Sequence, residues 1–175
     1  MEKDTTYKFN FSRRVIYLTL LHIVVSVLFA YLLYIFYEGG YLSAWFASFV
    51  VALICLLTLS IPRRVVVSQS QVKIICILEL TEIDIADIVK VRKVNPRNLK
   101  WIIPLFGGYG FFGYYGLFFD LRRAERIKMY ATEWQYLVEI VDIYEDRYYI
   151  SCRDREKFVK DIQHRRCEND KLRAL

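Results

Sequence analysis

The chain has 175 residues and a formal net charge of +6, from 25 Lys and Arg against 19 Asp and Glu. An excess of this size is modest, so it favours contact with anionic lipid over binding to nucleic acid. The four cysteines have no paired spacing, so neither a disulfide framework nor a metal site is predicted. No motif implies a cofactor.

Residues 1–14 are expected to form a short polar tail. Tyr7, Phe9 and Phe11 alternate with polar residues, a pattern that suits a membrane surface, but a disordered tail is the simpler prediction. The tail ends in Arg13 and Arg14, immediately before the first apolar run.

Two long apolar runs follow, at residues 15–37 and 41–61, and neither contains Asp, Glu, Lys or Arg. Each is long enough to cross a hydrocarbon core of roughly 30 Å at about 1.5 Å per residue. Only Glu38, Gly39 and Gly40 separate them, so the two predicted helices form a hairpin. The first run is too long for a secretory signal and lacks a small-residue cleavage site.

Positive charge flanks this hairpin at both ends. Arg13 and Arg14 precede it and Arg63 and Arg64 follow it, whereas the charge between the two runs, on Glu38, is negative. By the positive-inside rule, both termini face the cytoplasm. The sequence therefore predicts an integral protein of the inner, or cytoplasmic, membrane.

Two features inside the hairpin have functional interpretations. His22 is ionisable at membrane depth, but neither run offers an acidic partner, so a neutral histidine bonded to the helix backbone or to a hydroxyl is favoured. Ala44, Ser48 and Ala52 recur every four residues, a spacing that lets a second helix approach closely. Packing within the hairpin is the simplest use of these small residues, and a contact between copies of the chain is the alternative.

After Pro62 the apolar period changes from helical to alternating, which predicts half-buried antiparallel strands. Turns are expected at Gln69 and Ser70 and at Glu145 and Asp146. The predicted strands cover residues 65–68, 72–80, 83–85, 89–92, 126–131, 136–144 and 147–152. An amphipathic helix is expected to follow Asp154, with Phe158, Val159 and Ile162 on its apolar face, and a C-terminal tail from residue 165.

Several short strands followed by one amphipathic helix form an α+β pattern. The segments VVVSQSQVKI, IDIADIVKV, GYGFFGYYGLF, RIKMYATEWQYLVEIVD and RYYISCRDREKFVKDI resemble a bacterial pleckstrin-homology-like (PH) domain over residues 63–164. The resemblance implies an antiparallel two-sheet β-barrel capped by a C-terminal helix, and it implies binding or assembly, not catalysis. The first hairpin turn lacks the Lys and Arg cluster by which eukaryotic PH domains bind inositol phosphates. Inositol phosphate binding is therefore not expected of this chain.

Residues 101–119, WIIPLFGGYGFFGYYGLFF, carry no charge and have three interpretations. A third membrane helix is long enough, but five glycines and Pro104 disfavour it. Gly108, Gly110 and Gly113 match a dinucleotide-binding turn, yet no helix is predicted after them. The favoured interpretation is an irregular hairpin whose rings rest on the inner leaflet or on another subunit. Burial of these rings in the core of the domain itself is the equal alternative.

No HExxH, Walker or GxSxG motif is present, so the protein is not expected to be an enzyme. We expect a membrane-anchored, non-catalytic adaptor for binding or assembly, with the bilayer, its anionic headgroups and a protein partner or second copy as contacts. An oligomeric transport or pore-associated subunit is the alternative. The residues expected to contact the membrane or a partner are Arg63, Arg64, Arg97, Lys100, Trp101, Phe106, Tyr109, Phe111, Phe112, Tyr114, Tyr115, Arg122, Arg123 and Arg126.

Overall fold

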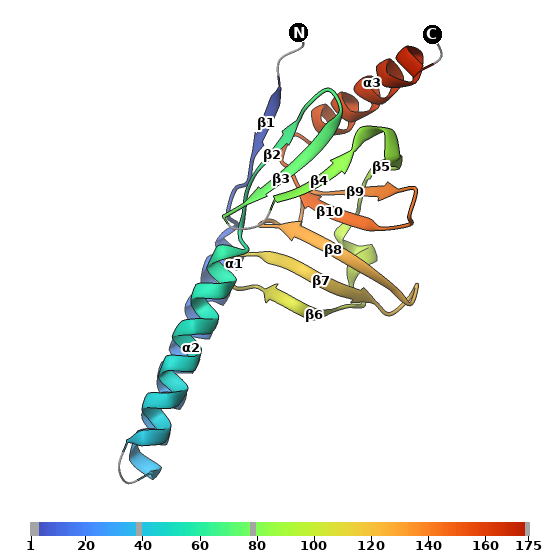
Figure 1. The fold of residues 1–175 in the computed structure, drawn as a ribbon. Helices are drawn as coiled ribbons and strands as arrows, with labels where there is room; N and C mark the ends of the chain where they lie inside the picture. Colours follow the sequence, from blue (N-terminus) through green and yellow to red (C-terminus); the bar gives the residue numbers. More distant parts are fainter. Residues whose placement is uncertain (1–3, 38–39, 78–79, 174–175) are drawn as a thin grey trace.

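The structure is a computed structural model that describes residues 4–37, 40–77 and 80–173. Two long helices extend from a strand-rich domain, and a third helix lies at the opposite end of that domain (Figure 1). The helices are α1 (Arg13–Phe36), α2 (Tyr41–Leu59) and α3 (Arg155–Arg173), and the short 3-10 helices are η1 (Ile85–Asp87) and η2 (Pro96–Leu99). The strands are β1 (Thr5–Lys8), β2 (Pro62–Val67), β3 (Gln71–Cys76), β4 (Leu80–Asp84), β5 (Ile88–Lys93), β6 (Ile102–Tyr109), β7 (Tyr114–Asp120), β8 (Glu125–Ala131), β9 (Leu137–Asp142) and β10 (Arg147–Ser151).

The two apolar runs form the expected pair of helices. The Ser12 side chain caps α1 by accepting a hydrogen bond from the Val15 N–H at 3.3 Å, and Gly40 precedes α2 in the left-handed conformation with φ of 65°. Of the residues in these two helices, only Val15 and Thr19 are buried. Both helices are long and apolar enough to cross a membrane. Glu38 and Gly39, predicted to belong to the turn, lie outside the described residues.

The helices contact each other along one side of α2. The Phe29 and Phe46 ring centroids lie 4.9 Å apart, and the partly covered side chains of α2 include Ser43, Phe46, Val50, Ile54 and Leu57. Ala44, Ser48 and Ala52 are exposed instead. These three small residues therefore do not form the contact within the hairpin that was their simplest predicted use.

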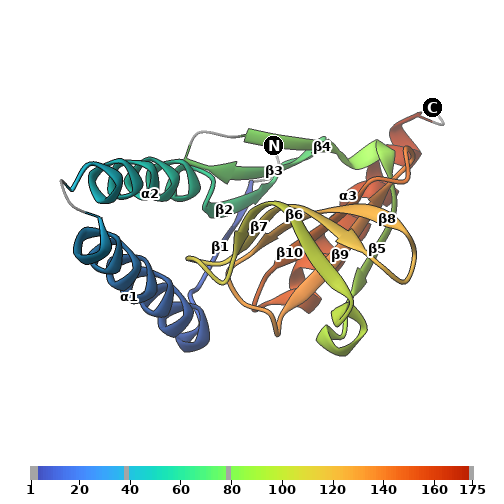
Figure 2. The same cartoon turned by 90° about the horizontal axis from the view of Figure 1, so that it is seen from below.

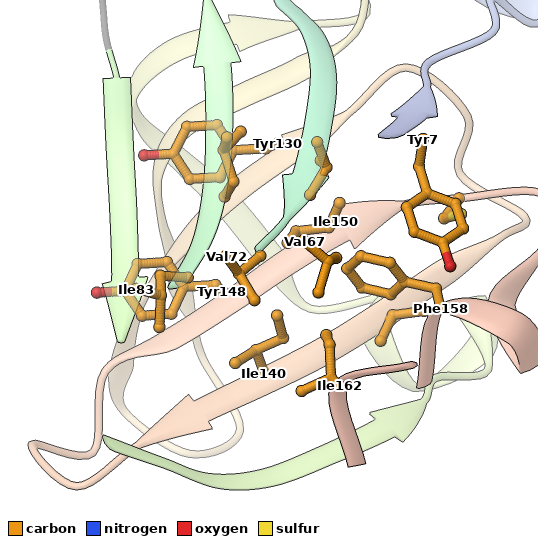
Figure 3. Packing of buried hydrophobic residues seen from close by; sticks show 14 of the residues in the cluster. Tyr7, Val67, Val72, Ile83, Tyr130, Ile140, Tyr148, Ile150, Phe158 and Ile162 are labelled. Atoms are coloured by element: carbon orange, nitrogen blue, oxygen red, sulfur yellow. The ribbon is translucent and has the colours of Figure 1, made fainter. Parts of the chain in front are cut away.

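The strands form two sheets, in the orders β1-β2-β3-β4 and β5-β9-β10-β8-β7-β6. Every pairing is antiparallel except that of β8 with β10. Val67, Ile140 and Phe158 lie in the core between the first sheet, the second sheet and α3 (Figure 3). The two-sheet arrangement with a terminal helix is confirmed. Among the described strands, none of one sheet pairs with a strand of the other, so the predicted closed barrel is not seen.

The N-terminal segment was wrongly expected to be a disordered tail. Residues Thr5 to Lys8 pair with Val67 to Arg64 of β2, so β1 is the outer strand of the first sheet. Tyr7 is buried, contacts the Phe158 ring edge to face at 5.0 Å and donates a hydrogen bond to Asp161 (Figure 3). The alternation around Tyr7 thus reflects pairing within the domain. The helical hairpin is consequently an insertion between two neighbouring strands.

The C-terminal segment was also wrongly expected to be a tail. Helix α3 continues to Arg173 because its second half still has contacts with the domain. Arg165 is buried and donates to the Thr5 hydroxyl at 3.3 Å, and Arg166 donates to the Val89 carbonyl at 2.7 Å. The predicted strand 72–80 also differs from the structure, because β3 ends at Cys76 and β4 begins at Leu80.

The second sheet buries residues on both faces. Val138, Ile140 and Ile150 face the core described above, whereas Leu137 and Tyr149 belong to a second cluster. This second cluster includes Val94 and Leu99, from the segment that joins β5 to β6, and Val15 of α1. The base of the hairpin is therefore built into the core of the domain.

Candidate membrane-contact site

The glycine and aromatic stretch forms the β6–β7 hairpin at one edge of the second sheet. Residue 107 pairs with residue 116, and both glycines have positive φ, 130° and 106°. A Cβ atom on Gly107 would lie 2.0 Å from the Tyr115 carbonyl oxygen, so a side chain there would push the strands apart. An irregular hairpin is thus confirmed, and the membrane-helix and dinucleotide-turn interpretations are wrong, because no helix forms in this stretch.

Strand β6 is an edge strand whose middle is exposed on both faces. Its residues from Ile103 to Gly107 are all exposed, and Phe106 has 82% of its surface accessible. Trp101 and Tyr109, which flank this stretch, are half exposed. Figure 1 shows β6 on the side of the domain toward which the hairpin extends, and Figure 2 shows both from that side. A soluble domain seldom leaves an apolar edge of this kind uncovered.

The tip of the β6–β7 hairpin is fixed to helix α1 through Thr19. The Thr19 hydroxyl accepts a hydrogen bond from the Phe112 N–H at 2.9 Å and lies 2.9 Å from the Val15 carbonyl and 3.3 Å from the Gly110 carbonyl. A Cβ on Gly110 would lie 2.9 Å from the Leu18 side chain, so glycine permits this close approach. The tip and the helix therefore form one unit. Neither Thr19 nor Leu18 was identified from the sequence, where they were two more residues of an apolar run.

Some rings of this stretch are exposed and others are buried in the core of the domain. Phe106 and Tyr109 are exposed and Phe112 is partly covered, as expected for rings that rest on a membrane or a partner. The remaining three rings, Phe111, Tyr114 and Tyr115, are buried. Tyr114 packs against the Trp134 ring with centroids 4.6 Å apart. Burial in the core of the domain is thus correct for these three rings, and contact of the other rings with a membrane or a partner stays a prediction.

The basic residues predicted to face headgroups lie at two places in the domain. Arg63 and Arg64 are exposed on β2, directly after the hairpin. The second group lies around η2 and the turn between β7 and β8, which are joined by a 2.9 Å hydrogen bond from the Leu121 N–H to the Trp101 carbonyl. Its members are all exposed, and they are Arg97, Lys100, Arg122, Arg123 and Arg126.

Arg123 has a second role that the sequence did not indicate. It donates at 3.3 Å to Glu139, a carboxylate with no exposed surface that also accepts from Arg92, from Arg147 at 3.1 Å and from the Tyr149 hydroxyl at 2.7 Å. Burial alone would raise the pKa of Glu139, but the hydrogen bonds from Arg92, Tyr149 and Arg147 outweigh it and lower this pKa to about 2. Arg123 is therefore partly engaged within the protein.

Among the described residues, no group of three or more His, Cys, Asp or Glu side chains could hold a metal ion. His22, the ionisable residue in the hairpin, has its Nδ1 atom 2.6 Å from the Leu18 carbonyl. Since a carbonyl only accepts, this nitrogen donates, as expected for a histidine bonded to the backbone of its own helix. The geometry of the site provides apolar contact and positive charge.

Comparison with known proteins identifies the family of the domain that carries this site. The family model for a bacterial PH domain matches residues 63–166, which is more than half of the chain. The chain belongs to the bacterial PH domain family. The resemblance found in the sequence is thereby confirmed. Neither the curated proteins nor the solved structures contain a match.

The matched segment contains the β6–β7 half of the site but not its α1 half. It begins at β2, so the PH domain match leaves out β1 and the helical hairpin. Strand β1 nevertheless completes the first sheet. The site thus joins a PH domain surface to an insertion outside the matched segment.

Proposed function

We propose that this PH domain protein is a membrane-anchored, non-catalytic adaptor that binds or assembles a partner at the cytoplasmic face of the inner membrane. Helices α1 and α2 cross the bilayer, both termini are cytoplasmic, and strand β6 rests on the inner leaflet. Membership of the bacterial PH domain family supports the binding role.

The observation that carries this proposal is the exposed apolar edge of β6. Ile103, Leu105 and Phe106 are each at least 43% exposed, and their strand β6 lies on the side of the domain from which the hairpin extends (Figure 1). Burying such side chains in lipid is favourable by about 25 cal/mol per Å² of apolar surface. The membrane at the base of the hairpin is the nearest apolar environment. It would bury the exposed side chains of β6 without a protein partner.

The positions of the basic residues support the same orientation. Arg13 and Arg14 lie at the start of α1, and Arg63 and Arg64 follow α2 within β2, so four cations surround the base of the hairpin. Arg97, Lys100 and Arg122 lie near Trp101, beyond the other end of β6. Each cation near an anionic surface adds about 1 kcal/mol of attraction.

Trp101 is a native probe for this contact. In the full chain with Trp45→Phe and Trp134→Phe, lipids brominated near the headgroup should quench Trp101 more strongly than lipids brominated deep in the acyl chain. The control also carries Trp101→Phe and places the only tryptophan at Tyr144, an exposed residue in the β9–β10 turn. This control should not be quenched. An unquenched Trp101 would refute the proposed contact of β6 with the membrane.

An oligomeric membrane subunit is the second candidate, because Ala44, Ser48 and Ala52 are exposed on α2. Small residues at this spacing allow close contact with a helix of a second copy. Cysteine replacement of Ala52, in a chain whose Cys55 and Cys167 are changed to serine, should then give disulfide-linked dimers in membranes. A monomer under these conditions excludes contact along this face.

A further inference from the structure

The first sheet has exposed apolar residues at the end from which the helical hairpin leaves. Its strands are antiparallel, so the end of β1, the start of β2, the end of β3 and the start of β4 lie together. Phe11 follows β1, Ile77 follows β3 and Leu80 begins β4, and all three side chains are exposed. These three residues form what we call the apolar end of the first sheet.

The strand register places two of these residues beside the end of α2 (Figure 1). Cys76 pairs with Pro62, which lies three residues after the last residue of α2. Paired strands are about 4.8 Å apart, so Ile77 lies close to the point where α2 joins the sheet. Leu80 pairs with Ile75 and lies one strand further from the helix. Both side chains are therefore at the level where the hairpin leaves the domain.

Phe11 lies at the base of the other helix. It directly precedes Ser12, whose side chain caps α1. Two residues before it, the Phe9 N–H donates to the Arg63 carbonyl at 3.4 Å, so the chain runs beside β2 almost to this point. Tyr7 and Phe9 pack against the core, whereas Phe11 is exposed. The apolar end therefore extends across the sheet from its first strand to its last.

The opposite end of the first sheet is polar. Gln69 and Ser70 lie in the exposed turn between β2 and β3, and the exposed Asp84 ends β4. Helix α3 lies against this end, because Asn169 donates to the Gln69 carbonyl at 3.0 Å. Apolar residues at one end and polar residues at the other are expected when only the first end contacts a membrane.

Exposed arginines surround the base of the hairpin at the same level. Arg13 and Arg14 begin α1, and Arg63 and Arg64 belong to the first turn of chain after α2. Each can attract an anionic headgroup by about 1 kcal/mol. Apolar side chains accompanied by cations are typical of surfaces that rest among lipid headgroups. This charge favours a lipid surface over an apolar protein partner as the contact of the apolar end.

We propose that the apolar end of the first sheet is a second membrane-contact surface. Phe11, Ile77 and Leu80 enter the headgroup region of the inner leaflet. This inference rests on the proposed function, because it needs the hairpin in the bilayer. It adds a contact of the first sheet to the contact of β6 in the second sheet. Contacts through both sheets hold the domain in one orientation about the hairpin.

Single tryptophans in the full chain test this inference in vesicles of phosphatidylethanolamine and phosphatidylglycerol. The three native tryptophans are changed to phenylalanine, and one tryptophan is introduced by Phe11→Trp or by Leu80→Trp. Lipids brominated near the headgroup should cause a loss of fluorescence at both positions, which lie at the two edges of the sheet. Gln69→Trp, at the polar end, is the matched control and should keep its fluorescence.

A gradient along β4 separates the position of the strand from the tendency of any tryptophan to enter the membrane interface. Leu80, Glu82 and Asp84 are exposed on one face of β4, and successive members of this set are about 6.8 Å apart. Quenching should decline from Leu80→Trp through Glu82→Trp to Asp84→Trp. Equal quenching at all three positions would overturn the inference. Quenching at only one of Phe11→Trp and Leu80→Trp would also overturn it, because the contact would then not extend across the sheet.

Quenching of the native Trp101, in the chain with Trp45→Phe and Trp134→Phe, separates this inference from the proposed contact of β6. If Trp101 is quenched but Phe11→Trp and Leu80→Trp are not, the contact of the first sheet fails and that of β6 stands. If both introduced tryptophans are quenched but Trp101 is not, the contact of β6 fails and that of the first sheet stands. If none is quenched, both fail.

Discussion

Glu139 shows how a single buried charge stabilises the PH domain. Its carboxylate accepts hydrogen bonds from Arg92 of β5 and from Arg147 and Tyr149 of β10, the two strands that flank β9. Removing one member of such a cluster leaves the other charges without compensation. The sequence could not reveal this, because Glu139 lies in an apolar strand where any single acidic residue would be expected to face solvent.

We expect Glu139→Gln to destabilise the domain by roughly 3 kcal/mol. The pKa of Glu139 is lowered from 4.5 to about 2, so its contribution is full above the first value and is lost as the pH falls toward the second. The free energy of unfolding should therefore fall more steeply with acid in the wild type than in the variant. Glu156→Gln, which breaks the exposed pair with Lys93, is the control and should leave stability nearly unchanged.

The Thr19 hydrogen bond leads to a prediction about the contact between the helical hairpin and the domain. Thr19→Val removes the acceptor of the Phe112 N–H, which should destabilise this contact by about 1 to 2 kcal/mol. Hydrogen exchange at the Phe112 amide should therefore become faster. Thr58→Val is the matched control, because the Thr58 hydroxyl donates to the Cys55 carbonyl of its own helix. Equal protection of Phe112 in both variants would show that Thr19 does not hold the tip.

At the scale of an element, the β6–β7 hairpin depends on glycines whose neighbours are backbone atoms. Gly107→Ala would place a methyl group against the Tyr115 carbonyl in a conformation that alanine rarely adopts. We expect a large fall in the melting temperature and loss of Trp101 quenching. Leu105→Ser, on an exposed position of the same strand, should reduce quenching while leaving the melting temperature nearly unchanged.

The elements that could be predicted from the sequence are those with a strong local signal. The two apolar helices, the turn at Glu145 and the helix after Asp154 follow from hydrophobic runs, turn residues and a cap, and all are found near the expected positions. The exposed and buried rings of the 101–119 stretch could not be separated in advance. Their environment depends on Leu18 and Thr19 of α1, which lie about 90 residues earlier and carry no local signal.

At the scale of the whole molecule, β1 makes the region before the hairpin part of the domain that follows it. Tyr7→Ala removes a buried ring that packs on Phe158 and bonds Asp161, so it should cost about 3 to 5 kcal/mol in the unfolding of the domain. Phe11→Ala, at an exposed position nearby, should have little effect on denaturant unfolding. A Tyr7→Ala chain as stable as the wild type would show that β1 is dispensable.

The position of β1 also sets an order of events during synthesis. The ribosome produces β1 first, yet its pairing partner β2 emerges only after both helices have been made. In the proposed topology, the first sheet therefore cannot close until the hairpin has entered the bilayer and returned the chain to the same side. Complete folding of the domain then serves as a check on insertion, since a chain with only one helix across the membrane would leave β1 and β2 on opposite sides.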